Sequence, residues 1–351
     1  MDIHQDILRP WITRLLQAAG TDLVSAETIA DVFIRSSRRG LGHHDIHDLP
    51  HRLELLHSGR INPAPSFTVL RDEPALLAFD GDGGPGELCC SHALEGALQR
   101  AGHYGIGLAT VRRSNHFLAA YPYVQRGAER GALVLVLSNT DPTMTGPGGT
   151  EAIIGNNPLG FGAPGTPPLL FDSCLAYSSI GHLQTLRREG GSIPPHWALG
   201  PDETPTTDPG EALEGWRLRP IGEHKGFGLA LMQEVLTAVL AGGETTTAIQ
   251  RPGGINSHSQ TVIAIAPDGS CPESFSRGVK TLEEQMAARG ERLPGAAGAN
   301  PGPREEIHVR EETWAALEGW SETLGVGPPG DNAPGIAPLP PGIIDTPDHR
   351  V

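Results

Sequence analysis

A cluster of histidines and aspartates lies near the amino terminus, in the stretch GHHDIHDLPHRLELLHSGRINP that begins at residue 42. If this stretch is helical, His44, either His47 or Asp48, and His51 share one face, because neighbours on a helix recur every three to four residues. Imidazole and carboxylate both bind zinc and iron, so a metal site is one interpretation. Pro50 argues against it, since a proline inside a helix removes a hydrogen bond. A catalytic surface and a solvated helix face stay open as alternatives.

A second candidate for chemistry is His116, in the segment RRSNHFLAAYPY. We expect a strand to end before it and a helix to begin after it, and loops at such junctions often carry catalytic groups. A histidine there can give or take a proton near neutral pH, because its unperturbed pKa is about 6.5. The alternative is that Asn115 and His116 only cap the helix.

The elements that must position these residues alternate between helix and strand in the first part of the chain. Two amphipathic helices are expected within residues 1–40, with Ser25 as the N-cap of the second. Strands are expected at 75–80, 106–113 and 132–138, and helices at 91–105 and 121–131. This alternation indicates an α/β fold.

The remaining sequence is less regular. Residues 142–168 are rich in Gly and Pro and are expected to form turns, and 189–210 read as a polar loop. We expect a buried helix at 224–243, a strand at 260–267, an amphipathic helix at 310–326 and an extended tail from 327 onward.

Composition limits the classes of function. The net charge of −15 repels phosphate backbones, which argues against nucleic acid as a partner. No segment approaches the roughly 20 apolar residues that span a bilayer, and no secretory signal is evident. The cysteines include no CxxC pair and read as reduced, mostly buried thiols: Cys89, Cys90, Cys174 and Cys271. A cytoplasmic protein is expected.

Two segments match the G-x-G-x-x-G pattern of Rossmann phosphate-binding loops. In the first, Gly81–Gly86, Pro85 lies where the helix should begin, and no acidic residue follows about 20 positions on to bind a ribose. The second, which begins at Gly160, leads into TPPLLF and begins no helix. Neither segment therefore favours a Rossmann domain.

Several motifs follow one another in a recognisable order: VRRSNHF, LSNTDP, GPGGTEAIIGNNPLGFGAP, IPPHWALGPDETPTTDP and GEHKGFGLALMQEVL. Together they resemble the malate/L-lactate dehydrogenase family, which also contains ureidoglycolate dehydrogenase, diketogulonate reductase and piperideine-2-carboxylate reductase. The resemblance covers nearly the whole chain. It implies a non-Rossmann α/β dehydrogenase fold with a helical N-terminal region and a mixed, largely antiparallel sheet in the cofactor domain.

The resemblance also implies an organisation and a reaction. The expected regions are a helical 1–75, a cofactor-binding and catalytic 76–310 with an irregular loop at 183–218, and a C-terminal helix and tail, 311–351, that pack back on the first. Family members use NAD or NADP, are commonly homodimers, and transfer hydride directly, so no metal is required. His116 matches the family's acid–base histidine, and such help is typically worth about 10²–10⁴-fold in rate.

Further roles come from motif matching. GLGHHDIHDLP resembles the family's G-x-x-Ser-His-Gly-x-x-Arg-Leu-Pro, so His44 matches a second catalytic histidine, while His47 and His51 read as solvated surface histidines. The cofactor-binding candidates are Lys225, His224, Gly226, Cys174, Leu175 and Ala176. The substrate-binding candidates are Asp48, His43, Arg52, Thr140 and Asn156. Lys225 is one of only two lysines in a chain with 26 Lys and Arg residues, which suggests a site that a planar guanidinium would not fit.

Departures from the family pattern gather around the substrate. Asp48 stands where the family has an arginine that would bind a substrate carboxylate, which reverses the sign of the interaction. His43 replaces a serine, Leu118 a glycine and Asn156 a threonine. Arg52 is a candidate replacement cation. We therefore hypothesise a reductase of a biosynthetic pathway whose substrate is not a plain 2-oxo acid. Imine reduction is a second interpretation, and a catalytically silent relative that binds a small molecule is a third.

Overall fold

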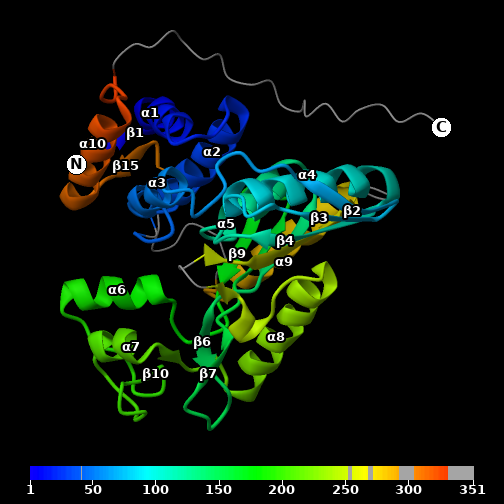
Figure 1. The fold of residues 1–351 in the computed structure, drawn as a ribbon. Coiled ribbons are helices and arrows are strands. Elements are labelled where there is room, and N and C mark those ends of the chain that lie inside the picture. Colours follow the sequence, from blue (N-terminus) through cyan, green and yellow to red (C-terminus); the bar gives the residue numbers. More distant parts are fainter. Residues whose placement is uncertain (41, 252–254, 268–271, 292–303, 331–351) are drawn as a thin grey trace.

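The computed structural model describes residues 1–40, 42–251, 255–267, 272–291 and 304–330, and a seven-stranded sheet forms its centre (Figure 1). The strand order is β2-β3-β4-β14-β5-β8-β9. The strands are β2 (Thr68–Glu73), β3 (Leu76–Asp80), β4 (Ile106–Ser114), β14 (His258–Ile265), β5 (Leu133–Ser138), β8 (Leu159–Ala163) and β9 (Leu169–Ser173). In this sheet β3 and β4 are parallel and all other neighbours are antiparallel. The predicted α/β fold with a mixed, largely antiparallel sheet is confirmed.

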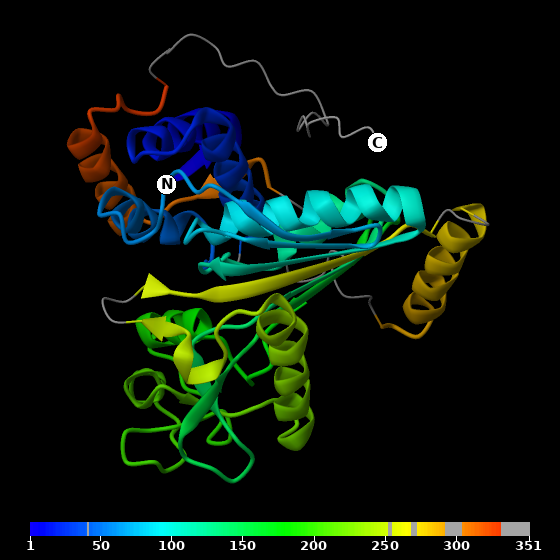
Figure 2. The same ribbon diagram turned by 45° about the vertical axis from the view of Figure 1, so that its right-hand side comes forward.

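Two helices, α4 (Gly86–Tyr104) and α5 (Tyr121–Glu129), pack on this sheet (Figure 2). The helix α4 connects the parallel pair β3 and β4, as expected of a strand–helix–strand unit. It approaches the sheet so closely that a Cβ on Gly107 would lie 2.1 Å from the carbonyl oxygen of Ala97. A glycine is therefore required where β4 passes under the helix.

The glycine-rich loop 81–86 does lie between a strand and a helix, but the protein's own backbone fills it. A Cβ on Gly86 would lie 2.2 Å from the carbonyl oxygen of Asn115 and 2.4 Å from that of His116. The side-chain amide of Asn115 donates to the carbonyls of Gly83 and Gly84, each at 2.9 Å. The glycines thus let the start of α4 contact the His116 loop.

The N-terminal region is helical. It contains α1 (Gln5–Ala18), α2 (Leu23–Arg39), the short 3-10 turn η1 (Ile46–Asp48) and α3 (Leu49–His57), with β1 (Asp2–His4) paired to β15 (Glu306–His308). The expectation of Ser25 as N-cap is wrong. Asp22 caps α2, because its carboxylate accepts from the N–H and the hydroxyl of Ser25, at 3.0 Å and 2.6 Å.

The late helix α10 (Glu311–Leu324) contacts α1 and α3. Trp11 packs against Trp314 with ring centroids 5.3 Å apart, and its indole N–H donates to Ser321. The helix predicted within 310–326 therefore covers the N-terminal helices. The tail was expected from 327 onward, and its part from 331 to 351 lies outside the described residues.

A second lobe lies below the sheet in Figures 1 and 2. It contains a four-stranded sheet of order β10-β11-β6-β7, with the helices α6 (Ile180–Glu189), α7 (Pro209–Gly215) and α8 (His224–Glu234). Its strands are β6 (Pro142–Thr145), β7 (Ala152–Gly155), β10 (Ala198–Leu199) and β11 (Arg217–Leu218). Residues 142–163, expected as turns, therefore contain the strands β6, β7 and β8. In β8, Gly160 and Gly162 let the strand pack closely under Ala120 and Val124 of the α5 segment.

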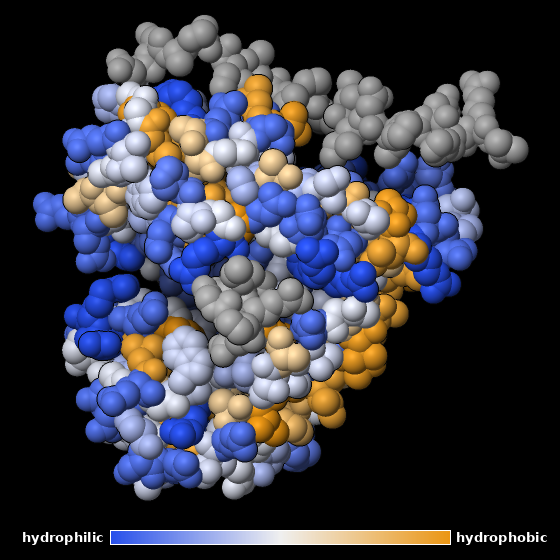
Figure 3. Space-filling model, viewed as in Figure 1, coloured by the Kyte–Doolittle hydropathy of each residue, from blue (hydrophilic) through white to orange (hydrophobic). Residues whose placement is uncertain are grey.

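The helix expected at 224–243 forms as α8 followed by a π-helical turn, η2 (Val235–Val239), but the prediction that it is buried is wrong. Gly226, Ala230 and Glu234 face inward. Its other side exposes about half of several large apolar side chains: Leu229, Leu231, Met232, Val235, Val239 and Leu240. The same surface appears as an apolar patch at the lower right of Figure 3.

The elements β2, α6, α7 and α9 (Pro272–Ala287) were not expected from the sequence. Short elements complete the structure: η3 (Thr246–Ala248) and the hairpin of β12 (Gln250–Arg251) with β13 (Ile255–Asn256). Within the described residues, no helix is both long and apolar enough to cross a membrane.

Candidate functional site

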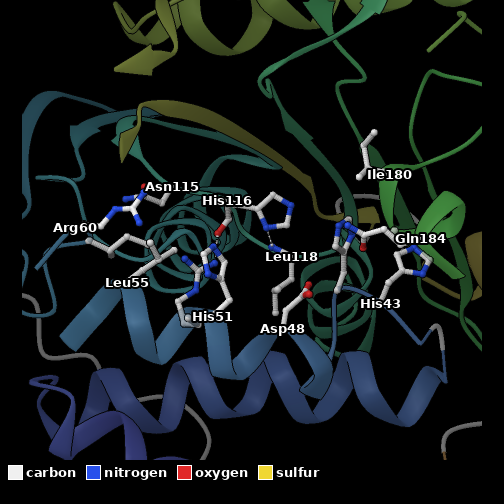
Figure 4. A pocket seen from close by; sticks show the side chains of 14 residues that line it. His43, Asp48, His51, Leu55, Arg60, Asn115, His116, Leu118, Ile180 and Gln184 are labelled. Atoms are coloured by element: carbon white, nitrogen blue, oxygen red, sulfur yellow. Dashed lines mark hydrogen bonds between the residues drawn. The ribbon is translucent and has the colours of Figure 1, made fainter. Parts of the chain in front are cut away.

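A cavity of about 300 Å³ lies between the N-terminal region and α6 (Figure 4). The segment around η1 and α3, the loop after β4 and the start of α6 each contribute to its wall. Its lining residues are His43, His44, Asp48, His51, Arg52, Leu55, Arg60, Ile61, Asn115, His116, Leu118, Ile180, Gly181 and Gln184. The structure thus brings His44 and His116 together with three of the predicted substrate-binding residues, His43, Asp48 and Arg52.

His116 lies in the loop between β4 and α5, half-buried in the cavity wall (Figure 4). Its Nδ1 accepts a hydrogen bond from the N–H of Leu118 at 3.3 Å, and its ring centroid is 4.8 Å from that of His44. Burial, with a smaller contribution from His44, holds the pKa of His116 well below its usual value. The lowered pKa favours the neutral ring, and while Nδ1 accepts from Leu118 the proton of that neutral ring is on Nε2.

The alternative that Asn115 and His116 only cap α5 does not hold. The N-cap of α5 is Ala120, without a side-chain cap. Leu118 has a φ of 67°, in the left-handed region that favours glycine, which explains the glycine of the family pattern at this position. The loop is therefore shaped to present the imidazole rather than to begin the helix.

Arg52 and Glu87 form a buried ion pair beneath His116. The guanidinium Nε donates to Oε1 of Glu87 at 2.9 Å, and Nη2 donates to the carbonyl of His116 at 2.7 Å. Arg52 is 5% exposed and Glu87 is fully buried. Burial raises the pKa of Glu87, while Arg52 opposes that shift. The pair stabilises the loop that carries His116, so the charge of Arg52 is already compensated within the protein.

The histidine-rich stretch is not one helix. His43 and His44 precede η1, and Pro50 lies in the first turn of α3, where a proline is tolerated. The rings of His43 and His44 are 5.1 Å apart, and Nε2 of His43 is 3.3 Å from the hydroxyl of Ser179. Burial lowers the pKa of His44 to about 4 and raises that of Asp48.

His51 is exposed and pairs with Glu54, as predicted for a solvated histidine. The same prediction for His47 is wrong. Its Nδ1 lies 2.8 Å from the hydroxyl of Thr313 on α10, and burial lowers its pKa to about 3. His47 therefore joins α10 to this stretch. Within the described part of the chain, no group of three or more His, Cys, Asp and Glu is arranged to hold a metal ion.

The predicted cofactor-binding residues gather outside this cavity. Ala176 pairs with Pro220, and the N–H of Ile221 donates to the carbonyl of Leu175 at 2.9 Å. Gly226 packs against Ile221, where a Cβ would lie 2.4 Å from the carbonyl oxygen. Two further positions complete this group: His224 and Lys225 are exposed at the start of α8, and Cys174 is half-buried beside Leu175.

Thr140 and Asn156 do not line the cavity. The hydroxyl of Thr140 donates to Oδ1 of Asn156 at 3.0 Å, and the carbonyl of Asn156 accepts from the N–H of Leu175 at 2.8 Å. The pair therefore connects the cofactor candidates to the end of β5. Among the thiols, Cys89 and Cys90 are buried and Cys174 half-buried, while Cys271 lies outside the described residues.

Four polar residues around His116 were not predicted. Arg60 lines the cavity, whereas Asp141, Glu234 and His258 lie in a polar region behind the His116 loop. Asp141 stands within the recognised LSNTDP motif, which was the available signal. His258 begins a strand that periodicity predicts, but only three-dimensional pairing places it beside β4.

Known proteins share this sequence and fold. The family described as malate/L-lactate dehydrogenase matches residues 3–317. The chain is 33% identical over 264 residues to a malate dehydrogenase of Pyrococcus abyssi, which covers 73% of each chain. It is 31% identical over 329 residues to the Delta(1)-pyrroline-2-carboxylate/Delta(1)-piperideine-2-carboxylate reductase of Pseudomonas syringae pv. tomato, covering 91% of this chain and 94% of the relative.

Solved structures agree. The delta1-piperideine-2-carboxylate reductase of Pseudomonas syringae has a TM-score of 0.82 at 26% identity, over 91% of this chain and 99% of that one. The sulfolactate dehydrogenase of Methanocaldococcus jannaschii has a TM-score of 0.81 at 28% identity, over 93% and 98%. The fold and the relatives define an oxidoreductase, a dehydrogenase or reductase. The chain belongs to the malate/L-lactate dehydrogenase family, as the sequence motifs predicted.

Proposed function

We propose that the protein transfers hydride between NAD or NADP and a C=O or CH–OH carbon of a small substrate, with His116 as the acid–base. The observation that carries this proposal is that the His116 imidazole lies in the wall of the cavity, with its ring centroid 4.8 Å from that of His44. In reduction its Nε2–H gives a proton to the substrate oxygen. His44 contacts the same ring and shapes the substrate side.

Unpartnered polar atoms beside His116 support a nicotinamide site. Gln260 donates to the carbonyl of Asn115 at 3.1 Å, while its own Oε1 and the hydroxyl of Ser257 are buried without a partner in the described residues. Such atoms suit an amide-bearing group. The exposed ammonium of Lys225 suits a phosphate. When bound, nicotinamide supplies or accepts the hydride.

The cavity charges support a substrate other than a plain 2-oxo acid. Asp48 and Arg60 lie on different sides of His116 (Figure 4). Arg60 is 38% exposed and 3.9 Å from Glu54. We propose that Arg60 meets an anionic group, whereas Asp48 meets an amine or hydroxyl. Such a substrate suits a biosynthetic reductase.

Steady-state assays test the substrate. The panel is pyruvate, oxaloacetate, sulfopyruvate, the two cyclic imino acids of the similar reductases, and amine-bearing 2-oxo acids, each with NADH and NADPH. Asp48→Ala should raise KM for the amine-bearing compounds by about tenfold or more, since a buried charge-assisted contact is lost. Asp6→Ala, an exposed aspartate in α1, is the matched control. Fast turnover of pyruvate or oxaloacetate that Asp48→Ala leaves unchanged would discard the altered-substrate proposal.

Imine reduction is the second candidate. A reductase of cyclic imino acids aligns over 91% of this chain. The same histidine and cofactor serve a C=N bond. Preferred turnover of a cyclic imino acid over every ketone in the panel would establish this candidate.

We propose that the protein is a cytoplasmic homodimer, and the exposed apolar side of α8 and η2 supports the dimer. Leu231, Met232 and Val235 are 49–52% exposed, and a contiguous apolar surface of this kind marks an interaction site. A second copy can bury it by two-fold symmetry. Met232→Glu should halve the mass measured by light scattering, whereas an unchanged mass would count against this interface.

A further inference from the structure

His258 is a buried histidine beside His116 that the proposed reaction does not use. It begins β14 opposite Ser114, and its side chain is 1% exposed. Its ring centroid lies 6.4 Å from that of His116, at an interplanar angle of 65°. Neither of its ring nitrogens has a hydrogen-bond partner among the described residues, although buried polar atoms are nearly always paired.

Two carboxylates face this imidazole. Oδ2 of Asp141 lies 3.6 Å from Nε2 of His258, and the Asp141 side chain is 23% exposed. Glu234, on α8, is 3% exposed and accepts from the amides of Asn139 and Asn157, both at 3.3 Å. Asp141 is therefore the carboxylate that connects His258 with the surface.

The hydrogen bond from Leu118 to His116 means that the proposed reaction needs a proton donor for Nδ1 of His116. While Nδ1 accepts from Leu118, the neutral ring has one proton, on Nε2. Giving that proton to a substrate oxygen leaves an imidazolate unless Nδ1 gains a proton in the same event. The contact with Leu118 is long, at 3.3 Å, so a second donor can replace it.

We propose that His258, paired with Asp141, is a positioning residue that carries protons between solvent and His116. The inference rests on the proposed function, because it acts through His116. It adds the imidazole of His258, on the strand β14 next to β4, and the carboxylate of Asp141 to the site.

The protons and electrons balance in the reduction step, which leaves the proton of His116 on Nδ1, and exchange with water returns the ring to the Nε2 form before the next turnover. In reduction, hydride forms the new C–H bond and the C=O π electrons move to oxygen. The oxygen takes the Nε2 proton of His116, and Nδ1 takes a proton that the His258 ring passes through one bridging water, because the two ring centroids are 6.4 Å apart. His258 regains its proton from water through Asp141. Oxidation runs the same transfers in reverse.

Ring nitrogen NMR of protein labelled with ¹⁵N-histidine tests the relay without a substrate. Chemical shifts report which nitrogen carries the proton, and His116→Gln assigns the His116 signals. The wild type should show His116 exchanging between its two neutral forms. His258→Gln should leave it with the proton on Nε2 alone, because Leu118 then remains the only partner of Nδ1 among the described residues. An identical single form in both proteins would overturn the relay.

Kinetics provide the second readout, with the panel substrate that the wild type reduces fastest. His258→Ala should lower kcat by about 10²-fold while KM stays within about twofold, and added imidazole should restore part of kcat. Asp141→Asn should lower kcat by about tenfold and raise the solvent deuterium isotope effect. The control is His92→Ala, a half-buried histidine packed on Phe67 and Phe79, whose activity imidazole should not alter.

These outcomes separate the two proposals. Normal kcat in both His258→Ala and Asp141→Asn would overturn the relay and leave the proposed function standing. A wild-type chain that binds neither NADH nor NADPH would overturn the proposed function, whereas the NMR comparison still decides whether His258 and His116 exchange protons.

Discussion

The buried Arg52–Glu87 pair allows the sharpest perturbation of the site. Glu87→Gln keeps the shape of the side chain but leaves the Arg52 guanidinium, 5% exposed, without its counter-charge. Removing one partner of a buried pair typically costs about 3–5 kcal/mol. Because the amide oxygen can still accept from Nε, we expect the lower end, about 3 kcal/mol of unfolding free energy. Urea unfolding followed by circular dichroism measures it.

The double variant Arg52→Met/Glu87→Met separates stability from positioning. Apolar replacement of a whole buried pair is often neutral, so its unfolding free energy should lie within about 1 kcal/mol of wild type. Its kcat should nevertheless fall by about tenfold or more, because the carbonyl of His116 loses the donor at 2.7 Å and the ring is displaced. A loss below about 1 kcal/mol in Glu87→Gln, or full activity in the double variant, would refute this reasoning.

Two further predictions test the loops around the site. A Cβ on Gly86 would lie 2.2 Å from the Asn115 carbonyl oxygen, so Gly86→Ala should lower both stability and kcat. The control is Gly102→Ala in the same helix, where the added Cβ would meet no atom within 4 Å, and it should raise the unfolding free energy by about 0.5–1 kcal/mol. Burial raises the pKa of Asp45 to about 6 from 3.8, so its native state binds the extra proton, and its contribution to stability is present below pH 3.8 and lost as the pH rises through 6. Asn cannot ionise. The unfolding free energy of Asp45→Asn, measured with urea and taken relative to wild type, should therefore be higher at about pH 7.5 than at about pH 4.5. An equal difference at both pH values would contradict the assignment.

Much of the fold followed from local patterns. Apolar runs and turn residues predicted β4, β5, β14 and α10, because burial on the sheet imposes those patterns directly. The strands β6 and β7 escaped prediction, since each is four residues long and lies in a segment rich in Gly and Pro. The apolar sequence of α8 predicted burial, but periodicity does not say whether the same chain or a second copy covers a helix face.

The site was predictable only in part. Motif matching selected His44 and His116, which the structure places in ring contact. It gave Arg52 as a substrate-binding candidate and did not show its pairing with Glu87, because Glu87 is 35 residues away and only the fold brings the two charges together. His258 lies 142 positions after His116 in the sequence, and only the antiparallel pairing of β14 with β4 brings them together.

The central claim is that the His116 imidazole exchanges a proton with the substrate while hydride moves to or from nicotinamide. The most direct measurement compares wild type and His116→Gln in fluorescence titration with NADH or NADPH and in turnover of the preferred panel substrate. The account predicts cofactor binding within about twofold of wild type and a kcat lower by about 10²–10⁴-fold. Retention of wild-type kcat by His116→Gln would contradict it.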